Sequence, residues 1–333
     1  MALEPIVFVA ILAKQKEIVL PYWLECLKAL DYPKKRMILY VRSNNNTDAT
    51  EAILRGWIAE HGKEYLAVYE VYGDVDVPVE KYDVHEWNEE RFSVLAEIRQ
   101  ESIRKAIALQ ADYYFVCDVD NFLLPHTLRS LVGWGVGVVS PMLMYAYTDA
   151  EEPHREFYSN YHNVVTPNGY FENNDMYWKI LSREIRGLLD IDLVHCTYLI
   201  HRDVLPFVSY IDDSGRYEYV IFSDRLRQLG IAQYLDNTRP YGTITLVENV
   251  EACKQYMGAL TGLTQHASHL LRGALRDGDH LLFSKLVVPH LYQFFGGWHR
   301  QLLRWTERSA RYPSIVPTIN ASVLGGRRTE ALL

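Results

Sequence analysis

Residues 111–121 read ADYYFVCDVDN, an apolar run of five residues followed directly by two aspartates, Asp118 and Asp120. A continuous apolar run of this length is typical of a strand that is covered on both faces. Side chains two positions apart on extended backbone point the same way, so we expect both carboxylates to face one crevice. Mn²⁺ and Mg²⁺ prefer carboxylate oxygens and share their remaining positions with phosphate oxygens and water. The segment therefore predicts a divalent-metal site at the tip of a buried strand.

The region before this segment alternates apolar runs with helical patterns. The expected strands are Ile6–Leu12, Met37–Val41, Tyr65–Val71 and Tyr113–Cys117, and the expected helices are Glu17–Leu30, Thr50–His61 and Asn88–Leu109. This alternation predicts an α/β fold with a Rossmann-like, doubly wound and mostly parallel sheet. Ligands of such sheets bind outside the carboxyl ends of the strands, where the polar segments Ala13–Lys16, Ser43–Asp48 and Asp118–Asn121 fall. We expect these three loops to converge on one site.

The second half of the chain is less regular. The expected elements are a helix at Pro125–Trp134, strands at Val136–Ser140 and Leu193–Ile200, and a helix at Ile221–Leu229. We expect an α/β domain at residues 1–247 and a helical C-terminal extension with a loose tail at residues 248–333. In the extension, Phe294 and Trp298 alternate with basic side chains, a pattern typical of packing on the same domain, of a homodimer contact or of peripheral membrane contact.

Composition narrows the class of protein. The chain has 333 residues, a formal net charge of −8 and no dense basic stripe, so we expect no nucleic-acid partner. Four widely spaced cysteines predict reduced, buried thiols and neither a zinc site nor a disulfide framework. The apolar run near the N-terminus lacks the flanks of a secretory signal, and no stretch is long enough to span a bilayer. We therefore expect a soluble, cytoplasmic protein.

A second Asp-x-Asp motif, at Asp74 and Asp76, shows that the pattern alone is a weak signal. This copy leads into an acidic, proline-containing segment after the third expected strand. The copy at Asp118 follows the fourth strand and comes after a long helix that carries Arg91 and Arg99. We expect the Asp118 copy to hold the metal and the Asp74 copy to be a solvated turn.

Five ordered segments resemble a known family. They are LPYWLECLKALDYP at 20–33, HEWNEERFSVLAEIRQESI at 85–103, ADYYFVCDVDN at 111–121, YSNYHNVVTPNGY at 158–170 and LVHCTYL at 193–199. The opening resembles family 2 glycosyltransferases, and the whole of residues 5–245 is similar to the N-terminal glycosyltransferase domain of procollagen galactosyltransferases. The resemblance implies a GT-A fold, a UDP-sugar donor, and Mn²⁺ or Mg²⁺ as cofactor.

The resemblance also implies a set of donor contacts. It assigns Leu12, Ala13 and Lys14 and the segment Asn44–Asp48 to the uridine site. Arg99, as a phosphate contact, and Val119 are further candidate donor contacts. The resemblance assigns the metal to Asp118 and Asp120, with His195 as a third ligand or a donor contact. A histidine held in the core is the alternative for His195, and the solvated face of a helix is the alternative for Arg99.

An inverting transfer needs a general base near the acceptor hydroxyl. In family 2 enzymes an acidic residue stands before a helix that ends in R-L-R-x-x-G, which Arg225–Gly230 matches here. That resemblance places the base at Glu218, with Asp213 and its neighbour Asp212 as further candidates. Aromatic and amide side chains suit sugar recognition, so we also expect an acceptor-binding loop. Its candidate residues are Tyr158, Asn160, His162 and Tyr170.

The leading hypothesis is a metal-dependent transfer of galactose or glucose from a UDP-sugar to a hydroxyl of a carbohydrate or glycoprotein acceptor. Some positions differ from the family: Asn44 replaces an aspartate, Gln15 an asparagine, and Arg239 a histidine. These differences leave open a degenerate transferase that acts as a scaffold. A nucleotidyltransferase is the third hypothesis, but the loop after the first strand lacks the glycines that hold a triphosphate.

Overall fold

The computed structural model describes most of the predicted α/β region. The described residues are 4–75, 89–145, 159–162, 164–165, 171–172, 175–246 and 248–261. Several predictions fall outside these residues: the second aspartate of the Asp74 motif, Tyr158 and Tyr170 of the expected acceptor loop, and the aromatic stripe of the C-terminal extension.

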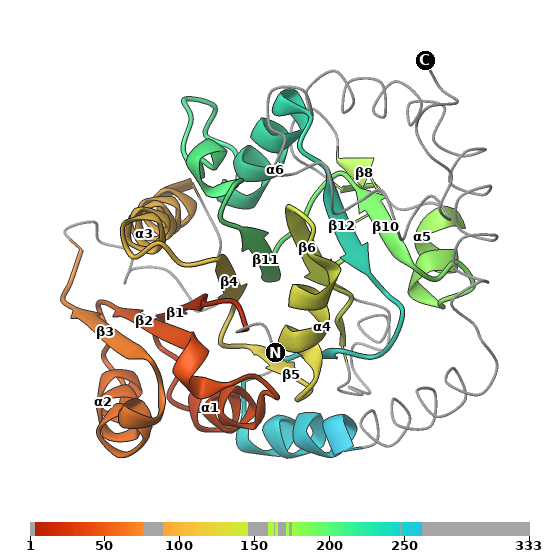
Figure 1. Cartoon of the computed structure of the whole chain (residues 1–333). Helices are drawn as coiled ribbons and strands as arrows, with labels where there is room; N and C mark the ends of the chain where they lie inside the picture. The colour runs from red at the N-terminus through yellow and green to blue at the C-terminus, as the bar shows by residue number, and fades with distance from the viewer. Residues whose placement is uncertain are drawn as a thin grey trace.

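An eight-stranded sheet forms the centre of the molecule (Figure 1). Its strands are β1 (Val7–Ala13), β2 (Met37–Ser43), β3 (Ala67–Tyr72), β4 (Tyr113–Cys117), β6 (Val138–Pro141), β10 (Leu188–Ile191), β11 (Thr197–His201) and β12 (Gln233–Asp236). They are arranged in the order β10-β12-β6-β11-β4-β1-β2-β3. Only β10 and β11 run against the other six strands. The predicted mostly parallel α/β sheet is confirmed.

Helices cover both faces of this sheet (Figure 1). They are α1 (Leu20–Ala29), α2 (Thr50–His61), α3 (Glu89–Ala108), α4 (Thr127–Trp134), α5 (Asp175–Leu181) and α6 (Glu218–Leu229). Alternate side chains of β1 enter two different cores, because successive residues of a strand point to opposite faces. Val7 and Val9 share one core with residues of α1, α2 and α4, whereas Phe8 and Ala10 share the other with residues of α3, α5 and α6.

The strand predicted at Leu193–Ile200 is wrong in its first half, because β11 begins only at Thr197. Cys196 has a φ of 63°, a left-handed backbone that ends regular pairing. Its carbonyl instead accepts the backbone N–H of Asp118 at 2.9 Å. His195 and Cys196 therefore lie in a loop at the edge of the sheet. The short strands β10 and β12 were not predicted.

A small second sheet fixes the turn after β4. It consists of β5 (Asn121–Leu123), β13 (Gly242–Ile244) and β7 (Met144–Tyr145), in the order β5-β13-β7. A separate hairpin pairs β8 (Val164–Val165) with β9 (Phe171–Glu172). The backbone N–H of Thr245, just after β13, donates to the carbonyl of Asp120 at 2.7 Å. The aspartate turn is thus held by backbone bonds from a segment 125 residues later in the chain.

Residues 250–261 form a helix that packs on the same side of the sheet as α1 (Figure 1). Its residues Ala252, Cys253 and Tyr256 are fully buried in the core that contains Val7 and Trp23. The division of the chain at residue 247 stays a prediction. All four cysteines are free thiols; Cys26, Cys117 and Cys253 are buried, as expected, whereas Cys196 is partly exposed. No helix among the described residues is long and apolar enough to cross a membrane.

The contact between β13 and β5 yields a prediction about stability. Gly242 has a φ of 154°, and a Cβ at this position would lie 2.2 Å from the carbonyl oxygen of Phe122. We expect Gly242→Ala to lower the free energy of unfolding by about 3 kcal/mol, because the backbone must shift. Gly133→Ala is the control: nothing lies within 4 Å of that position, at an exposed site in α4. It should raise stability by about 0.5–1 kcal/mol. Urea denaturation measures both, and equal stabilities would contradict the prediction.

Candidate active site

One cavity of about 580 Å³ opens at the carboxyl edge of the parallel strands. Its lining includes nearly all the residues that the sequence assigned to donor, metal and base: Leu12, Ala13, Lys14, Asn44, Arg99, Asp118, Val119, Asp120, His195 and Glu218. They come from the ends of β1, β2 and β4, from the loop before β11, and from α3 and α6. The predicted convergence of three loops is therefore present in the structure.

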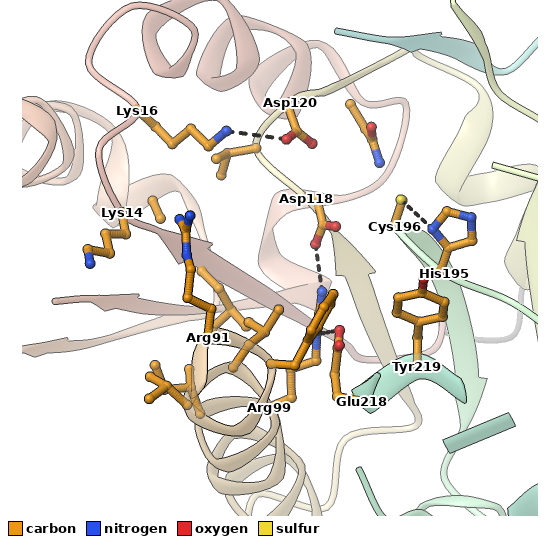
Figure 2. Close-up of a pocket in the computed structure, with 18 of the residues that line it drawn as sticks. Lys14, Lys16, Arg91, Arg99, Asp118, Asp120, His195, Cys196, Glu218 and Tyr219 are labelled. Carbon is orange, nitrogen blue, oxygen red and sulfur yellow. Dashed lines mark hydrogen bonds and ion pairs between the residues drawn. The ribbon is translucent and has the colours of Figure 1, made fainter. Parts of the chain in front are cut away.

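Asp118 and Asp120 reach this cavity through a tight turn. The backbone N–H of Asn121 donates to the carbonyl of Asp118 at 2.9 Å, so the segment is not the extended backbone that we assumed. Both side chains still face the cavity, each about one-third exposed. They turn toward different partners in Figure 2, Asp118 toward Arg99 and Asp120 toward Lys16.

Arg99 lies between two acids of the cavity (Figure 2). Its guanidinium is 2.9 Å from Oδ1 of Asp118 and 3.4 Å from Oε1 of Glu218. Arg99 and Glu218 are both almost fully buried, with about 5% of each side chain exposed. The alternative that Arg99 stands on a solvated helix face is therefore wrong. Its predicted contact with a phosphate remains a prediction.

Burial changes the acidity of both carboxyl groups. The pKa of Glu218 is raised to about 7, mainly because burial disfavours its charge, and Arg99 only partly offsets this. The pKa of Asp118 is also raised, by burial first and by the nearby charge of Asp120, against the lowering effect of Arg99. A carboxyl group with a pKa near neutral can exchange a proton at the pH of a cell. Glu218 therefore has the acidity expected of a general base.

Lys16, at the end of the loop after β1, pairs with acids from two other parts of the chain. Its Nζ lies 3.3 Å from Oδ2 of Asp120 and donates a hydrogen bond to Oε1 of Glu248. Burial lowers the pKa of Lys16, but the two carboxylates outweigh it and leave the pKa above its ordinary value. The ammonium is therefore charged at all physiological pH values.

A stack of three rings forms another wall of the cavity. The ring of His195 lies between His162, at a centroid distance of 4.7 Å, and Tyr219, at 5.1 Å. Burial lowers the pKa of His162 to about 4 and that of His195 well below its ordinary value, so both imidazoles are neutral. Nδ1 of His195 lies 2.7 Å from Sγ of Cys196 (Figure 2).

Other predicted site residues lie elsewhere. Asp48 does not line the cavity; it accepts the backbone N–H groups of Thr50 and Glu17 at 3.0 Å each, and so ties α2 to the loop after β1. Asp213 is exposed on the loop before α6 and does not line the cavity either. Asp74, from the second Asp-x-Asp motif, accepts the backbone N–H of Asn45 at 2.8 Å.

Asn160 was predicted to contact the acceptor, but it has a structural role. Its amide donates to the carbonyl of Pro141 at 2.9 Å and its oxygen accepts the N–H of Leu143 at 2.8 Å. These bonds hold the chain beside β6. His162, from the same predicted loop, does line the cavity.

Sequence reasoning missed Lys16, Cys196, Tyr219 and Glu248 as parts of the site. Lys16 had a signal, since it lies in a loop predicted to reach the crevice. Tyr219 also had a sequence signal, because it follows the predicted base Glu218. Glu248 had none, because its partner Lys16 is 232 residues away in the sequence.

The donor set at the turn suits a hard divalent cation. Within the described residues, no three His, Cys, Asp or Glu side chains converge to hold a metal without further ligands. His195 therefore does not complete a three-residue site with the two aspartates in this structure. Two carboxylates at the mouth of a cavity fit Mn²⁺ or Mg²⁺ when phosphate oxygens and water supply the other ligands. That two side-chain cations already gather at these acids shows that the turn attracts positive charge.

Comparison with known proteins agrees with this architecture. Residues 4–257 match the model of the N-terminal domain of glycosyltransferase family 25. The chain belongs to this family. It is 31% identical to human procollagen galactosyltransferase 2 over 74% of its own length and 41% of that protein. It is 30% identical to human inactive glycosyltransferase 25 family member 3, over 85% of this chain and 47% of the relative. A glycosyltransferase 25 family member from Anopheles gambiae is 33% identical over 92% of this chain and 53% of that protein.

The chain thus spans about half the length of these family 25 relatives. The resemblance predicted over residues 5–245 and its GT-A fold are confirmed by the family match and the sheet. Among solved structures, S. aureus TarS in complex with UDP-GlcNAc is 12% identical with a TM-score of 0.46, covering 94% of this chain and 82% of that one. The mannosyltransferase PcManGT of Pyrobaculum calidifontis, in complex with GDP-Man and Mn²⁺, is 13% identical with a TM-score of 0.42, covering 98% and 89%.

The raised pKa of Glu218 predicts a gain in stability when its charge is removed. Between its ordinary pKa of 4.5 and about 7, the unfolded chain loses this proton while the folded chain keeps it, so stability falls as pH rises. Glu218→Gln removes this pH-dependent loss of stability, because glutamine has no proton to lose in this pH range. We expect the variant to be more stable than wild type by about 2 kcal/mol at pH 8 and equally stable near pH 4.5.

Urea denaturation at several pH values measures this difference. Glu97→Gln, an exposed glutamate of α3, is the matched control and should follow the wild type at every pH. A Glu218→Gln variant that loses stability at pH 8 would show that the folded protein favours the ionised carboxylate.

Proposed function

We propose that this protein is a metal-dependent, inverting hexosyltransferase that transfers galactose or glucose from a UDP-sugar to a hydroxyl of a carbohydrate or glycoprotein acceptor. The observation that carries the proposal is the shared cavity of Asp118, Asp120 and Glu218. It combines a carboxylate pair suited to a metal–diphosphate complex with a buried acid suited to proton transfer. The relatives named procollagen galactosyltransferase support the choice of galactose first and glucose second.

Asp118 and Asp120 would hold Mn²⁺ or Mg²⁺ at the turn after β4. When bound, the ion supplies Lewis-acid stabilisation of the charge on the departing diphosphate. Leu12, Ala13 and Lys14 at the end of β1, with Asn44 after β2, form the part of the cavity proposed for the nucleoside. The sugar of a donor held by these loops would lie in the remaining part of the cavity, which Glu218 also lines.

Glu218 is the proposed general base. In the described part of the chain, its Oε2 is buried and has no hydrogen-bond partner, so it can receive the proton of an acceptor hydroxyl. The hydroxyl oxygen then forms a bond to the anomeric carbon, and the bond from that carbon to the diphosphate oxygen breaks. Arg99 stabilises the carboxylate form of Glu218 before the transfer. Asp213 is exposed and does not line the cavity, so it is the second candidate for this role.

The aromatic wall fits the acceptor side of the reaction. The rings of His162, His195 and Tyr219 stack on one another and both imidazoles are buried and neutral, so this wall excludes water, and Tyr219 is the most exposed of the three rings to the cavity. Exclusion of water matters because water competes with the acceptor for the activated sugar.

A scaffold without activity is the second candidate. Three similar proteins are named inactive or probable inactive glycosyltransferase 25 family members, and Lys16 pairs with a carboxylate of the proposed metal pair. The deciding experiment measures UDP release with Mn²⁺ from UDP-galactose, UDP-glucose and one GDP-sugar, with and without carbohydrate acceptors. Turnover with a UDP-sugar supports the enzyme, and its absence with every donor and acceptor supports the scaffold.

A substitution in the aspartate turn tests the proposed metal site. Asp118→Asn should weaken the binding of UDP with Mn²⁺ by roughly 100-fold, because removing a ligand costs at least as much as disturbing its surroundings. Isothermal titration measures the affinity. Asp74→Asn is the control from the second Asp-x-Asp copy: its oxygen can still accept the N–H of Asn45, and binding should be unchanged. Full binding and turnover in Asp118→Asn would remove the basis of the proposal.

The pH dependence of turnover tests the base. The ionised carboxylate is the active form, so kcat/KM should rise with pH up to an apparent pKa of about 7. Glu218→Gln should lower kcat by about 10²–10⁴-fold and abolish this limb of the profile. Asp213→Asn separates the two candidates, since loss of the limb in that variant instead would move the base to the loop before α6.

A further inference from the structure

Lys16 occupies an unusual place among the cavity residues. Its ammonium bridges Asp120, one of the proposed metal ligands, and Glu248, the residue that precedes the helix at 250–261. The contact with Glu248 is largely shielded from solvent, with 16% of the Lys16 side chain and 11% of that of Glu248 exposed, whereas 29% of the Asp120 side chain is exposed. Shielded charges interact more strongly than exposed ones, because little water screens them. The shielded pair with Glu248 therefore holds the ammonium 3.3 Å from Oδ2 of Asp120, where it competes with any cation at that carboxylate.

Lys16 also lines the part of the cavity proposed for the donor. The loop that carries it follows β1 and, with the loop after β2, forms the wall proposed for the nucleotide. A diphosphate held by a metal at Asp120 would lie within reach of Lys16, because Nζ of Lys16 is 3.3 Å from Oδ2 of Asp120. The ammonium can exchange its carboxylate partner for a phosphate oxygen with no change in its own charge.

We infer that Lys16 is a coupling residue, which pairs with Asp120 while the cavity lacks donor and transfers to the donor diphosphate when metal and nucleotide bind together. This inference rests on the proposed function, because it assumes that the cation and the diphosphate meet at Asp120. Glu248 anchors the ammonium in both arrangements. The cation alone then binds weakly, since it must displace Lys16, whereas the cation with UDP binds tightly.

In this role Lys16 weakens the binding of Mn²⁺ alone and strengthens the binding of UDP. Lys16→Met should tighten the binding of Mn²⁺ alone by about tenfold and weaken the binding of UDP, so the mutual enhancement between the two ligands shrinks. Such coupling is reciprocal and typically amounts to roughly 5–150-fold. A side chain with only a structural role would weaken both ligands or neither. Mn²⁺ binding to the full chain is measured by electron paramagnetic resonance, with and without UDP, and needs no turnover.

Two further variants sharpen the test. Glu248→Gln leaves Asp120 as the remaining charged partner of Lys16, so it should weaken the binding of Mn²⁺ alone, in the direction opposite to Lys16→Met. Lys14→Met removes another lysine of the cavity that has no ion pair with Asp120 among the described contacts. It should lower UDP affinity without changing the affinity for Mn²⁺ alone. Thermal unfolding of each variant verifies that it is folded.

The possible outcomes separate this inference from the proposed function. If Asp120→Asn abolishes Mn²⁺ binding and Lys16→Met leaves it unchanged or weaker, the metal site stands and the coupling role of Lys16 is wrong. If Asp120→Asn binds Mn²⁺ as the wild type does, the metal site itself is wrong. Opposite shifts for the two ligands in Lys16→Met, with the reverse shift for Mn²⁺ in Glu248→Gln, support the coupling.

Discussion

The geometry of the site depends most on the buried guanidinium of Arg99. It joins three elements that are far apart in the sequence: α3, the turn after β4 and the first residue of α6. Without it, the buried acid Glu218 and the partly exposed acid Asp118 would face each other with no cation between them. Loss of both carboxylates would leave the buried guanidinium uncompensated, at a cost of about 3–5 kcal/mol, whereas loss of Glu218 alone leaves the closer pair with Asp118 in place. The carboxylates keep their positions because Arg99 is held by the core beneath them.

The position of the Arg99 guanidinium also explains why Asp118 and Glu218 are suited to different roles. Asp118 has the closer contact with Arg99, at 2.9 Å, and is about one-third exposed, whereas Glu218 is buried and 3.4 Å away. Burial without full compensation is what raises the pKa of Glu218 to about 7. A ligand for a cation must be ionised, and a base must be able to take up a proton. The sheet edge supplies the more exposed acid for the first task and the helix start supplies the buried acid for the second.

The parts of this site that follow from local sequence were predictable. The apolar runs of β1, β2 and β4 specify strands covered on both faces, and polar residues after each run mark the edge where ligands bind. Glu218 was found through the resemblance of the helix that follows it. The pairing of Lys16 with Glu248 was not predictable, because it depends on how a helix more than 230 residues away packs on the sheet. The position of His195 was also missed, since it depends on the left-handed backbone of Cys196.

The departures from the family pattern alter chemistry more than shape. Gln15 has a φ of 54°, and its side chain exchanges hydrogen bonds with Thr47 at 2.7 Å in both directions, so the loops after β1 and β2 are joined. Asn44 donates to Oδ1 of its neighbour Asn45 at 2.9 Å and still lines the cavity. The replaced residues therefore maintain the wall proposed for the nucleoside and remove a negative charge from it. Because the bonds between Gln15 and Thr47 join the two loops, the wall keeps its form in spite of these replacements, which the proposed binding of a nucleotide requires.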